Sequence, residues 1–182
     1  MAKIFFFLFV LLLGHFSLAA EEGQIRFGGQ AGNVGPADKV NGTDVGNAMG
    51  AGAIFNFAVT DEMMLEIAYT GSNHNHLKHT NLGAGINFFF NSYDPAYFYL
   101  SAGADFNNHV VEIPAGDKSA TGFGLYAGLG VDFDLGKNFS TGLQAIYHNS
   151  FGSNIDFPPS VNVIPNYTTV MLRLLFVIPP SK

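Results

Sequence analysis

The chain of 182 residues contains neither cysteine nor tryptophan, and only 12% of its residues are charged. Without cysteine, neither a disulfide framework nor thiol chemistry is possible. Soluble domains have about a quarter of their residues charged, so the low charge content indicates a largely apolar surface. The formal net charge of −6 is spread along the chain without a basic run. We therefore expect no nucleic-acid partner.

Long apolar runs are also missing after the first 20 residues, which excludes membrane-spanning helices there, because each would need about 18 apolar residues. The first 20 residues resemble a secretory signal peptide, with an apolar run over residues 4–13. Small residues at Ser17-Leu18-Ala19, or at the following Ala20, offer a cleavage site. A retained membrane anchor is the alternative, but the run is short for one. We expect residues 1–20 to be removed and residues 21–182 to form one exported domain.

Glycine and aromatic residues are abundant instead, with 22 Gly, 19 Phe and 7 Tyr. Between residues 122 and 133 every odd position is apolar, while the even positions are glycines, Tyr126 and Asp132. Successive side chains of a strand point to opposite faces, so this segment has one apolar face and one small or polar face. A helix is disfavoured, because each glycine would cost about 1 kcal/mol relative to alanine.

Seven other segments show the same alternation, which predicts eight strands in total. The connections alternate between short turns and polar loops, with the loops at residues 32–45, 71–80, 107–120 and 149–166. An even number of antiparallel strands with this arrangement of turns and loops is typical of outer-membrane barrels. A strand of about ten residues, tilted near 45°, rises about 24 Å and matches their apolar band. The predicted fold is all-β, an eight-stranded antiparallel up-and-down transmembrane β-barrel.

A soluble barrel of the lipocalin type, binding an apolar ligand with its apolar face turned inward, is the alternative. Its exterior would then consist of glycines and a few polar side chains with almost no Lys, Glu or Arg, which is a poor soluble surface. The same small residues suit the wall of a narrow lumen. We therefore expect the apolar faces to contact lipid.

Two hairpins resemble those of a known family. Residues 59–69, Val-Thr-Asp-Glu-Met-Met-Leu-Glu-Ile-Ala-Tyr, resemble the periplasmic-turn hairpin of small Gram-negative outer-membrane barrels of the opacity-protein and OmpA transmembrane-domain type. Residues 128–135, Gly-Leu-Gly-Val-Asp-Phe-Asp-Leu, resemble a later hairpin of these proteins. The resemblance implies a bacterial outer-membrane location and a structural, surface-interaction or minor ion-pore role rather than an enzymatic one.

The last predicted strand is similar to the C-terminal assembly signal of this family, carried here by Leu172, Leu174 and Phe176. Six residues follow Phe176 and an earlier glycine of the signal is missing, so the sequence departs from the usual pattern. The resemblance implies that the partners are outer-membrane lipids, lipopolysaccharide and the outer-membrane assembly machinery. It also implies a monomer without a cofactor. Tyrosines near the strand ends are expected in interfacial girdles; they are Tyr69, Tyr97, Tyr147 and Tyr167.

Turning the apolar faces outward places six polar side chains inside the barrel, Asp105 and Gln144 among them. The other four are charged and are expected at a similar depth: Arg26, Glu66, Asp132 and Arg173. An arginine on the lipid face near the bilayer midplane would cost about 2–4 kcal/mol, and both arginines avoid that face. We expect these residues to form a lumenal ion-pair cluster that fills the barrel, because eight strands enclose little more than their own side chains. A gate for small ions is the alternative function of the cluster.

Three histidines, His74, His76 and His79, form an H-x-H-x-x-H group within one predicted loop. Imidazoles at this density can bind zinc, copper or nickel. The loop offers no carboxylate to complete or orient such a site, so a metal site is only the alternative interpretation of these residues.

The segment His148-Asn149-Ser150 resembles the His-x-Ser of the outer-membrane lipid A deacylase family. The resemblance would make His148 the base, Ser150 the nucleophile and Asp156 the orienting acid of a hydrolase. Phe151 stands where that family has asparagine, and alternation places His148 on the lumen face although a deacylase must face its lipid. The expected protein is therefore not an enzyme, with a deacylase-like esterase as the alternative.

Overall fold

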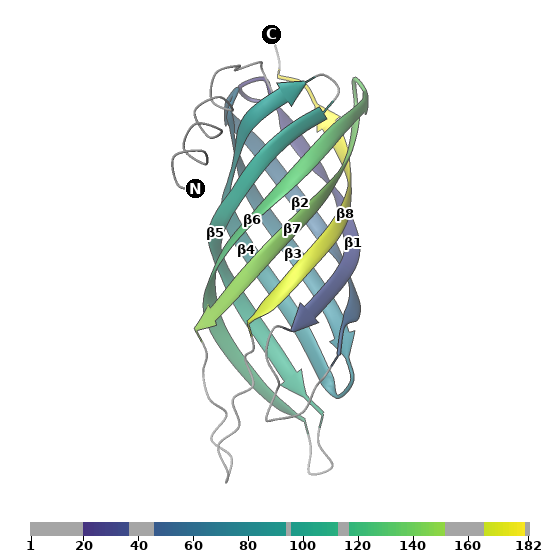
Figure 1. The fold of residues 1–182 in the computed structure, drawn as a ribbon, viewed down its shortest axis with the longest axis vertical. Helices are drawn as coiled ribbons and strands as arrows, with labels where there is room; N and C mark the ends of the chain where they lie inside the picture. The colour runs from purple at the N-terminus through teal and green to yellow at the C-terminus, as the bar shows by residue number, and fades with distance from the viewer. Residues whose placement is uncertain (1–19, 37–45, 94–95, 113–116, 152–165, 181–182) are drawn as a thin grey trace, which may run out of the picture.

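The structure, a computed structural model, describes residues 20–36, 46–93, 96–112, 117–151 and 166–180. Its strands form one closed antiparallel barrel in which each strand pairs with its sequence neighbours and the last pairs with the first (Figure 1). The strands are β1 (Ile25–Pro36), β2 (Ala48–Thr60), β3 (Met63–His74), β4 (Leu77–Tyr93), β5 (Ala96–Val111), β6 (Lys118–Gly136), β7 (Phe139–Phe151) and β8 (Tyr167–Ile178). The predicted eight-stranded up-and-down barrel is confirmed.

The two ends of the barrel differ in their connections. β1 begins beside the end of β8, with Ile25 opposite Ile178, and the turns at that end span only a few residues. The longer connections, at residues 37–47 and 152–166, join strands at the opposite end. Outer-membrane barrels have short periplasmic turns and longer extracellular loops. The end where β1 begins and β8 ends, at the top of Figure 1, is therefore the periplasmic end.

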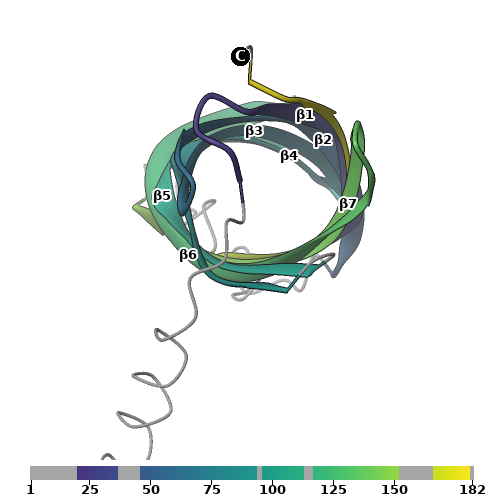
Figure 2. The ribbon, with the colours of Figure 1, turned by 90° about the horizontal axis from the view of Figure 1, so that it is seen from above.

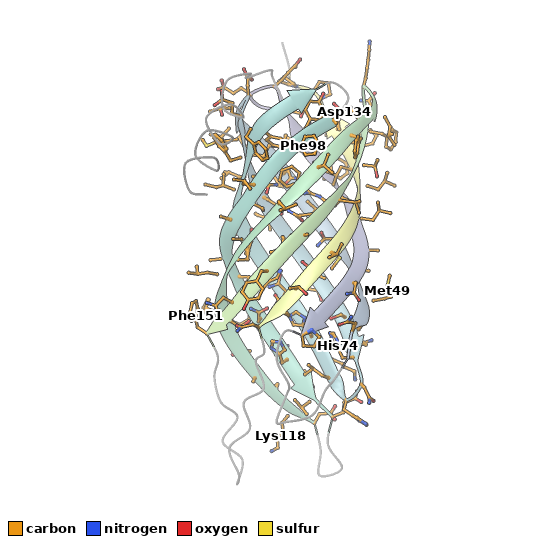
Figure 3. All side chains as sticks on the ribbon, in the orientation of Figure 1. Met49, His74, Phe98, Lys118, Asp134 and Phe151 are labelled. Atoms are coloured by element: carbon orange, nitrogen blue, oxygen red, sulfur yellow. The ribbon has the colours of Figure 1, made fainter. Side chains whose placement is uncertain are left out.

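Large apolar side chains cover the outside of the barrel (Figure 3). Every strand contributes exposed examples, among them Phe27, Phe55, Ile67, Ile86, Leu100, Leu129, Leu143 and Leu172. This is the reverse of a lipocalin-type barrel, whose apolar face would point inward. Among the described residues, no helix is long and apolar enough to cross a membrane.

Two of the predicted extracellular loops are largely strand, so the predicted loop ranges are wrong. β3 and β4 are joined by a turn of two residues, Asn75 and His76, in place of the loop predicted at residues 71–80. β5 and β6 likewise extend into the range 107–120. These stretches are too polar to look like membrane strands, but strands above the lipid are held by ladder hydrogen bonds and need no apolar face.

Two of the four predicted girdle tyrosines also lie elsewhere. Tyr97 and Tyr167 are buried, whereas Tyr69 and Tyr147 are exposed on the outside as expected. Strand parity explains the difference, because Tyr97 precedes the outward-facing Phe98 and must therefore point into the lumen. Position near a strand end does not by itself place a tyrosine in a girdle.

Glycines let the strands approach one another on the lumen side. A Cβ atom at Gly28 would collide with the carbonyl oxygen of Leu174 on β8, whereas one at the outward-facing Gly29 would meet only the Gly52 carbonyl oxygen, at 3.7 Å. Lumenal glycines also make room for larger residues, since the Tyr99 ring occupies the space that a side chain at Gly130 would need. The lumen is narrow enough that small residues are a steric requirement there.

Replacing these two neighbouring glycines should therefore have unequal effects. Gly28→Ala should lower the free energy of unfolding by about 1–3 kcal/mol, as overpacking does in cores. Gly29→Ala, the matched control, should change it by less than about 0.5 kcal/mol. Urea unfolding of the refolded barrel in lipid vesicles, followed by circular dichroism, measures both. Equal losses for the two variants would contradict this account of the lumen wall.

Candidate functional site in the barrel lumen

The lumen contains two groups of buried polar side chains, one above the other. We call Arg26, Glu66, Asp132 and Arg173 the charge cluster, and His79, Asp105, His109 and His148 the histidine cluster. All eight side chains are buried. The charge cluster lies toward the periplasmic end, and the histidine cluster lies toward the extracellular end, where β4 and β5 extend farthest.

Arg173 of β8 reaches across the lumen to Glu66 of β3. Its Nη2 donates to Glu66 Oε2 at 2.8 Å, and its Nη1 donates to the Tyr99 hydroxyl. The Glu66 carboxylate also accepts hydrogen bonds from Asn87 Nδ2 at 2.8 Å and from Gln144 Nε2 at 3.2 Å. Donors on three different strands thus converge on one buried carboxylate, which compensates its loss of hydration.

Arg26 of β1 pairs with Asp132 of β6 across the same level of the lumen, with 3.7 Å between Arg26 Nη1 and Asp132 Oδ2. Arg26 Nε donates to the Gln24 side-chain oxygen at 2.9 Å, and its guanidinium carbon lies 5.7 Å from the centre of the Tyr97 ring. The structure therefore arranges the four charges named from the sequence as two ion pairs, and each arginine also contacts a lumenal tyrosine.

The histidine cluster is built around Asp105 of β5. His148 Nδ1 lies 2.6 Å from Asp105 Oδ2, and Asn107 Nδ2 donates to Asp105 Oδ1 at 2.7 Å. The His148 ring stacks on the Tyr167 ring with 4.1 Å between their centres. Alternation along β5 and β7 had already placed Asp105 and His148 inside, but pairing two residues 43 positions apart requires knowing how those strands are arranged around the barrel.

His79 and His109 are cross-strand neighbours that stack with 4.6 Å between their ring centres. His79 is bonded to Asn107 Oδ1 at 3.2 Å, and this oxygen also accepts a bond from the Tyr167 hydroxyl at 2.8 Å. The sequence pattern did not single out His109 or Asn107, and Tyr167 was expected in an interfacial girdle. The available signal was the period of two that Asp105, Asn107 and His109 maintain beyond the apolar part of β5.

The three histidines named as alternative metal ligands do not share one location. His79 lies inside the barrel, and His76 occupies the tight turn with a φ of 60°. His74 is bonded through Nδ1 to the Gly46 carbonyl oxygen at 2.9 Å and through Nε2 to Ser72 Oγ at 3.1 Å. Within the described ranges, no three His, Asp or Glu side chains converge in a way that could hold a metal ion.

The residues named for an esterase are also not assembled in the described part of the chain. His148 is buried in the lumen and bonded to Asp105, and Ser150 Oγ is buried with no hydrogen-bond partner among the described residues. The β6 and β7 register is continuous around His148, so no bulge turns this side chain toward lipid. Asp156 lies outside the described residues.

The space between the two clusters is a cavity of about 20 Å³, lined by residues of both clusters, among them Glu66 and His148. A water molecule needs about 10–15 Å³ when volume is measured in this way, so the cavity has room for about one. Buried polar side chains therefore fill most of the lumen at both levels.

The residues of the expected assembly signal lie on the lipid face. Leu172, Leu174 and Phe176 are all exposed on the outer side of β8. The Phe176 ring lies between two other aromatic rings of neighbouring strands, 5.6 Å from Phe27 and 5.1 Å from Phe139 between ring centres. This seam of β1, β7 and β8 is where the barrel closes.

The solved structures that are similar to this chain include outer-membrane barrels. OprG of Pseudomonas aeruginosa is 14% identical, with a TM-score of 0.69 and coverage of 89% of this chain and 99% of that chain. The N-terminal β-barrel domain of OprF from Pseudomonas aeruginosa is 13% identical, with a TM-score of 0.63 and coverage of 86% and 98%. Ail, the attachment invasion locus protein of Yersinia pestis, is 16% identical, with a TM-score of 0.55 and coverage of 86% and 99%.

Comparison by sequence identifies the family. No curated protein sequence matches the chain. Residues 5–168 match the family model described as the outer membrane protein beta-barrel domain. The match covers most of the chain and agrees with the closed eight-stranded barrel and its apolar exterior. The chain therefore belongs to the outer membrane protein beta-barrel family and is a β-barrel of the bacterial outer membrane.

Proposed function

We propose that this protein is a closed, non-conducting outer-membrane barrel that acts at the extracellular surface, where it contacts lipopolysaccharide. The observation that carries the proposal is the filled lumen. Two buried ion pairs span one level of the lumen, and a hydrogen-bonded group around Asp105 spans the next. A barrel without an open path has only its outer surface and its two ends available for interaction.

The ion-pore and esterase alternatives have less support. Ion passage would require the Arg173 and Glu66 pair to separate, leaving charges that are fully buried without compensation. The esterase would require His148 to leave its bond with Asp105 and face lipid. We also propose that the protein is a monomer whose exposed Leu172, Leu174 and Phe176 are recognised by the outer-membrane assembly machinery.

The extracellular end supports a surface role because three strands project there. β4, β5 and β6 are the longest strands, and they extend beyond β7 and β8 at the end opposite the start of β1, at the bottom of Figure 1. Their projecting parts carry Thr80, Asn108 and Lys78. Glu112, the residue after β5, forms an exposed ion pair with Lys78, with 2.7 Å between Lys78 Nζ and Glu112 Oε1. This contact lowers the pKa of the Glu112 carboxyl, which therefore stays ionised. The similar barrel Ail is named as an attachment protein.

A groove on the outer face supports contact with lipopolysaccharide. It has a volume of about 490 Å³, and its floor includes the outward-facing Ala31, Ala51 and Gly71. Asn73, Lys78 and Thr80 line it toward the extracellular end. Lipopolysaccharide carries acyl chains, sugars and phosphates. Its acyl chains match the small apolar residues of the floor, and its sugars and phosphates match the polar rim with the Lys78 ammonium group. Lys78 has three N–H donors, so it can bind a phosphate as well as Glu112.

The closed lumen predicts that the barrel does not conduct ions. The purified barrel, reconstituted in planar bilayers, should show no steady conductance above that of bilayers treated with detergent alone. The lumenal charges are paired, and the cavity between the two clusters has room for about one water molecule. A steady conductance that changes with Arg173→Gln would instead assign the charge cluster to a gate.

Removing one partner of the Arg173 and Glu66 pair should strongly destabilise the barrel. Arg173→Ala leaves a buried carboxylate without its cation, so the free energy of unfolding should fall by about 3–5 kcal/mol. The double variant Arg173→Ala with Glu66→Gln should recover part of this loss, because no buried charge remains unpaired. Lys137→Ala, which removes an exposed cation from a periplasmic turn, is the matched control and should have little effect. Urea unfolding in vesicles measures all four proteins, and a double variant no more stable than Arg173→Ala would argue against charge pairing.

Filling the outer groove should weaken the contact with lipopolysaccharide. A Cβ at Gly71 would have ordinary contacts only, with the Tyr69 hydroxyl at 3.8 Å and Thr80 Cγ2 at 3.9 Å, so Gly71→Leu should fold. Mass spectrometry of barrels extracted in mild detergent should detect less bound lipopolysaccharide for Gly71→Leu and for Lys78→Ala. Ala104→Leu, which adds the same side chain to the outer face of β5, should retain it. Equal retention by all variants would exclude this groove as the contact.

A further inference from the structure

The segment before β1 is folded against the periplasmic mouth of the barrel. Figure 2 shows the chain turning inward over the opening just before β1. Ala20 is only 4% exposed and packs in an apolar cluster with Ala58, Met64, Phe89, Tyr97 and Tyr99. A residue buried among lumenal side chains is part of the folded barrel. This differs from the expectation that residue 20 is removed with the signal peptide.

Hydrogen bonds hold this segment to the end of β2 and to the turn between β2 and β3. Ala20 N donates to the Asp61 carbonyl oxygen at 3.2 Å, and Glu22 N donates to Asp61 Oδ1 at 3.0 Å. Gly23 N donates to the Ala58 carbonyl oxygen at 2.9 Å. The Gln24 side chain then accepts the bond from Arg26 Nε, which links the segment to the charge cluster.

The sequence around Ala20 contains two possible cleavage bonds. Cleavage after Ala19 places Ser17 and Ala19 at the two positions that signal peptidase requires to be small. Cleavage after Ala20 would place Leu18, a large residue, at the first of these positions. It would also remove the one residue of the segment that is buried in the apolar cluster.

We propose that signal peptidase hydrolyses the bond between Ala19 and Ala20, and that the new α-ammonium group of Ala20 docks on Asp61. Hydrolysis adds water across the peptide bond, giving a carboxylate on Ala19 and an amino group on Ala20 that takes up a proton. The nitrogen of Ala20 already lies beside Asp61, whose carboxylate provides the opposite charge. The processed amino terminus thereby becomes the part of the fold that covers the periplasmic mouth.

The cleavage bond is tested by identifying the first residue of the protein purified from outer membranes, using N-terminal sequencing and mass spectrometry of the terminal peptide. Ala20 is the expected first residue. Glu21 as the first residue would overturn the proposal, and so would an uncleaved chain.

The docking is tested by measuring how fast an amine-specific reagent labels the α-amino group of the folded barrel across a range of pH. The pKa of this group is about 7.7–8.0 when unperturbed and should be raised beside Asp61, so labelling at pH 8 should be slow. Asp61→Asn keeps an acceptor for Glu22 N but removes the charge, and should speed labelling severalfold. Glu62→Gln is the control, because it removes the neighbouring charge. The hydrogen bonds of Glu62 with Thr60 and Phe89 use its backbone and are kept. The α-amino group of this variant should therefore be labelled as fast as that of the wild type. Equal rates in all three proteins would overturn the docking even where Ala20 is the first residue.

Discussion

The structure depends on one constraint: a strand in lipid must have every backbone N–H and C=O paired, because the hydrocarbon offers no partner. The pairing of β1 with β8 over twelve residues meets this constraint by removing both edges of the sheet. Closure at eight strands then fixes the diameter and leaves an interior just wide enough for side chains. The outer face must therefore be apolar and the inner face must be small or mutually paired, which is the alternation seen in every strand.

The narrow lumen determines which polar groups can be inside. Each buried charge is costly unless an opposite charge and hydrogen bonds replace its lost water. Arg173 and Glu66 satisfy this requirement because their side chains meet across the lumen. The Glu66 carboxylate also accepts hydrogen bonds from Asn87 and Gln144. A slip of one residue in any of these strands would turn its charged side chain toward lipid. The charge cluster therefore makes wrong strand registers unfavourable. This effect does not depend on whether the ion pairs add to the free energy of unfolding.

Much of the barrel can be predicted from sequence because its determinants are local. Alternation within β6 gives the orientation of Phe123 and Asp132 without knowledge of any neighbouring strand. The loop of His74, His76 and His79 was mispredicted because strands outside the membrane lack the apolar face that identifies them. The bond between Asp105 and His148 could not be predicted, since it depends on the arrangement of β5 and β7 around the barrel. The same limit applies to Ala20, whose burial is created by residues from β2 to β5.

The division between a filled interior and an available exterior bears on function, because a fold of this kind does not by itself fix a role. An interior residue such as Arg173 cannot be changed without leaving a buried partner uncompensated, so the lumen has little freedom to adopt new chemistry. The outward-facing side chains of the projecting strand ends, such as Lys78 and Asn108, are under no such restriction, since they do not point into the lumen. Changes in those parts alter the surface of the cell while the paired interior keeps the barrel intact. Specificity in such a protein is therefore expected at the extracellular end, carried by residues that contribute little to its stability.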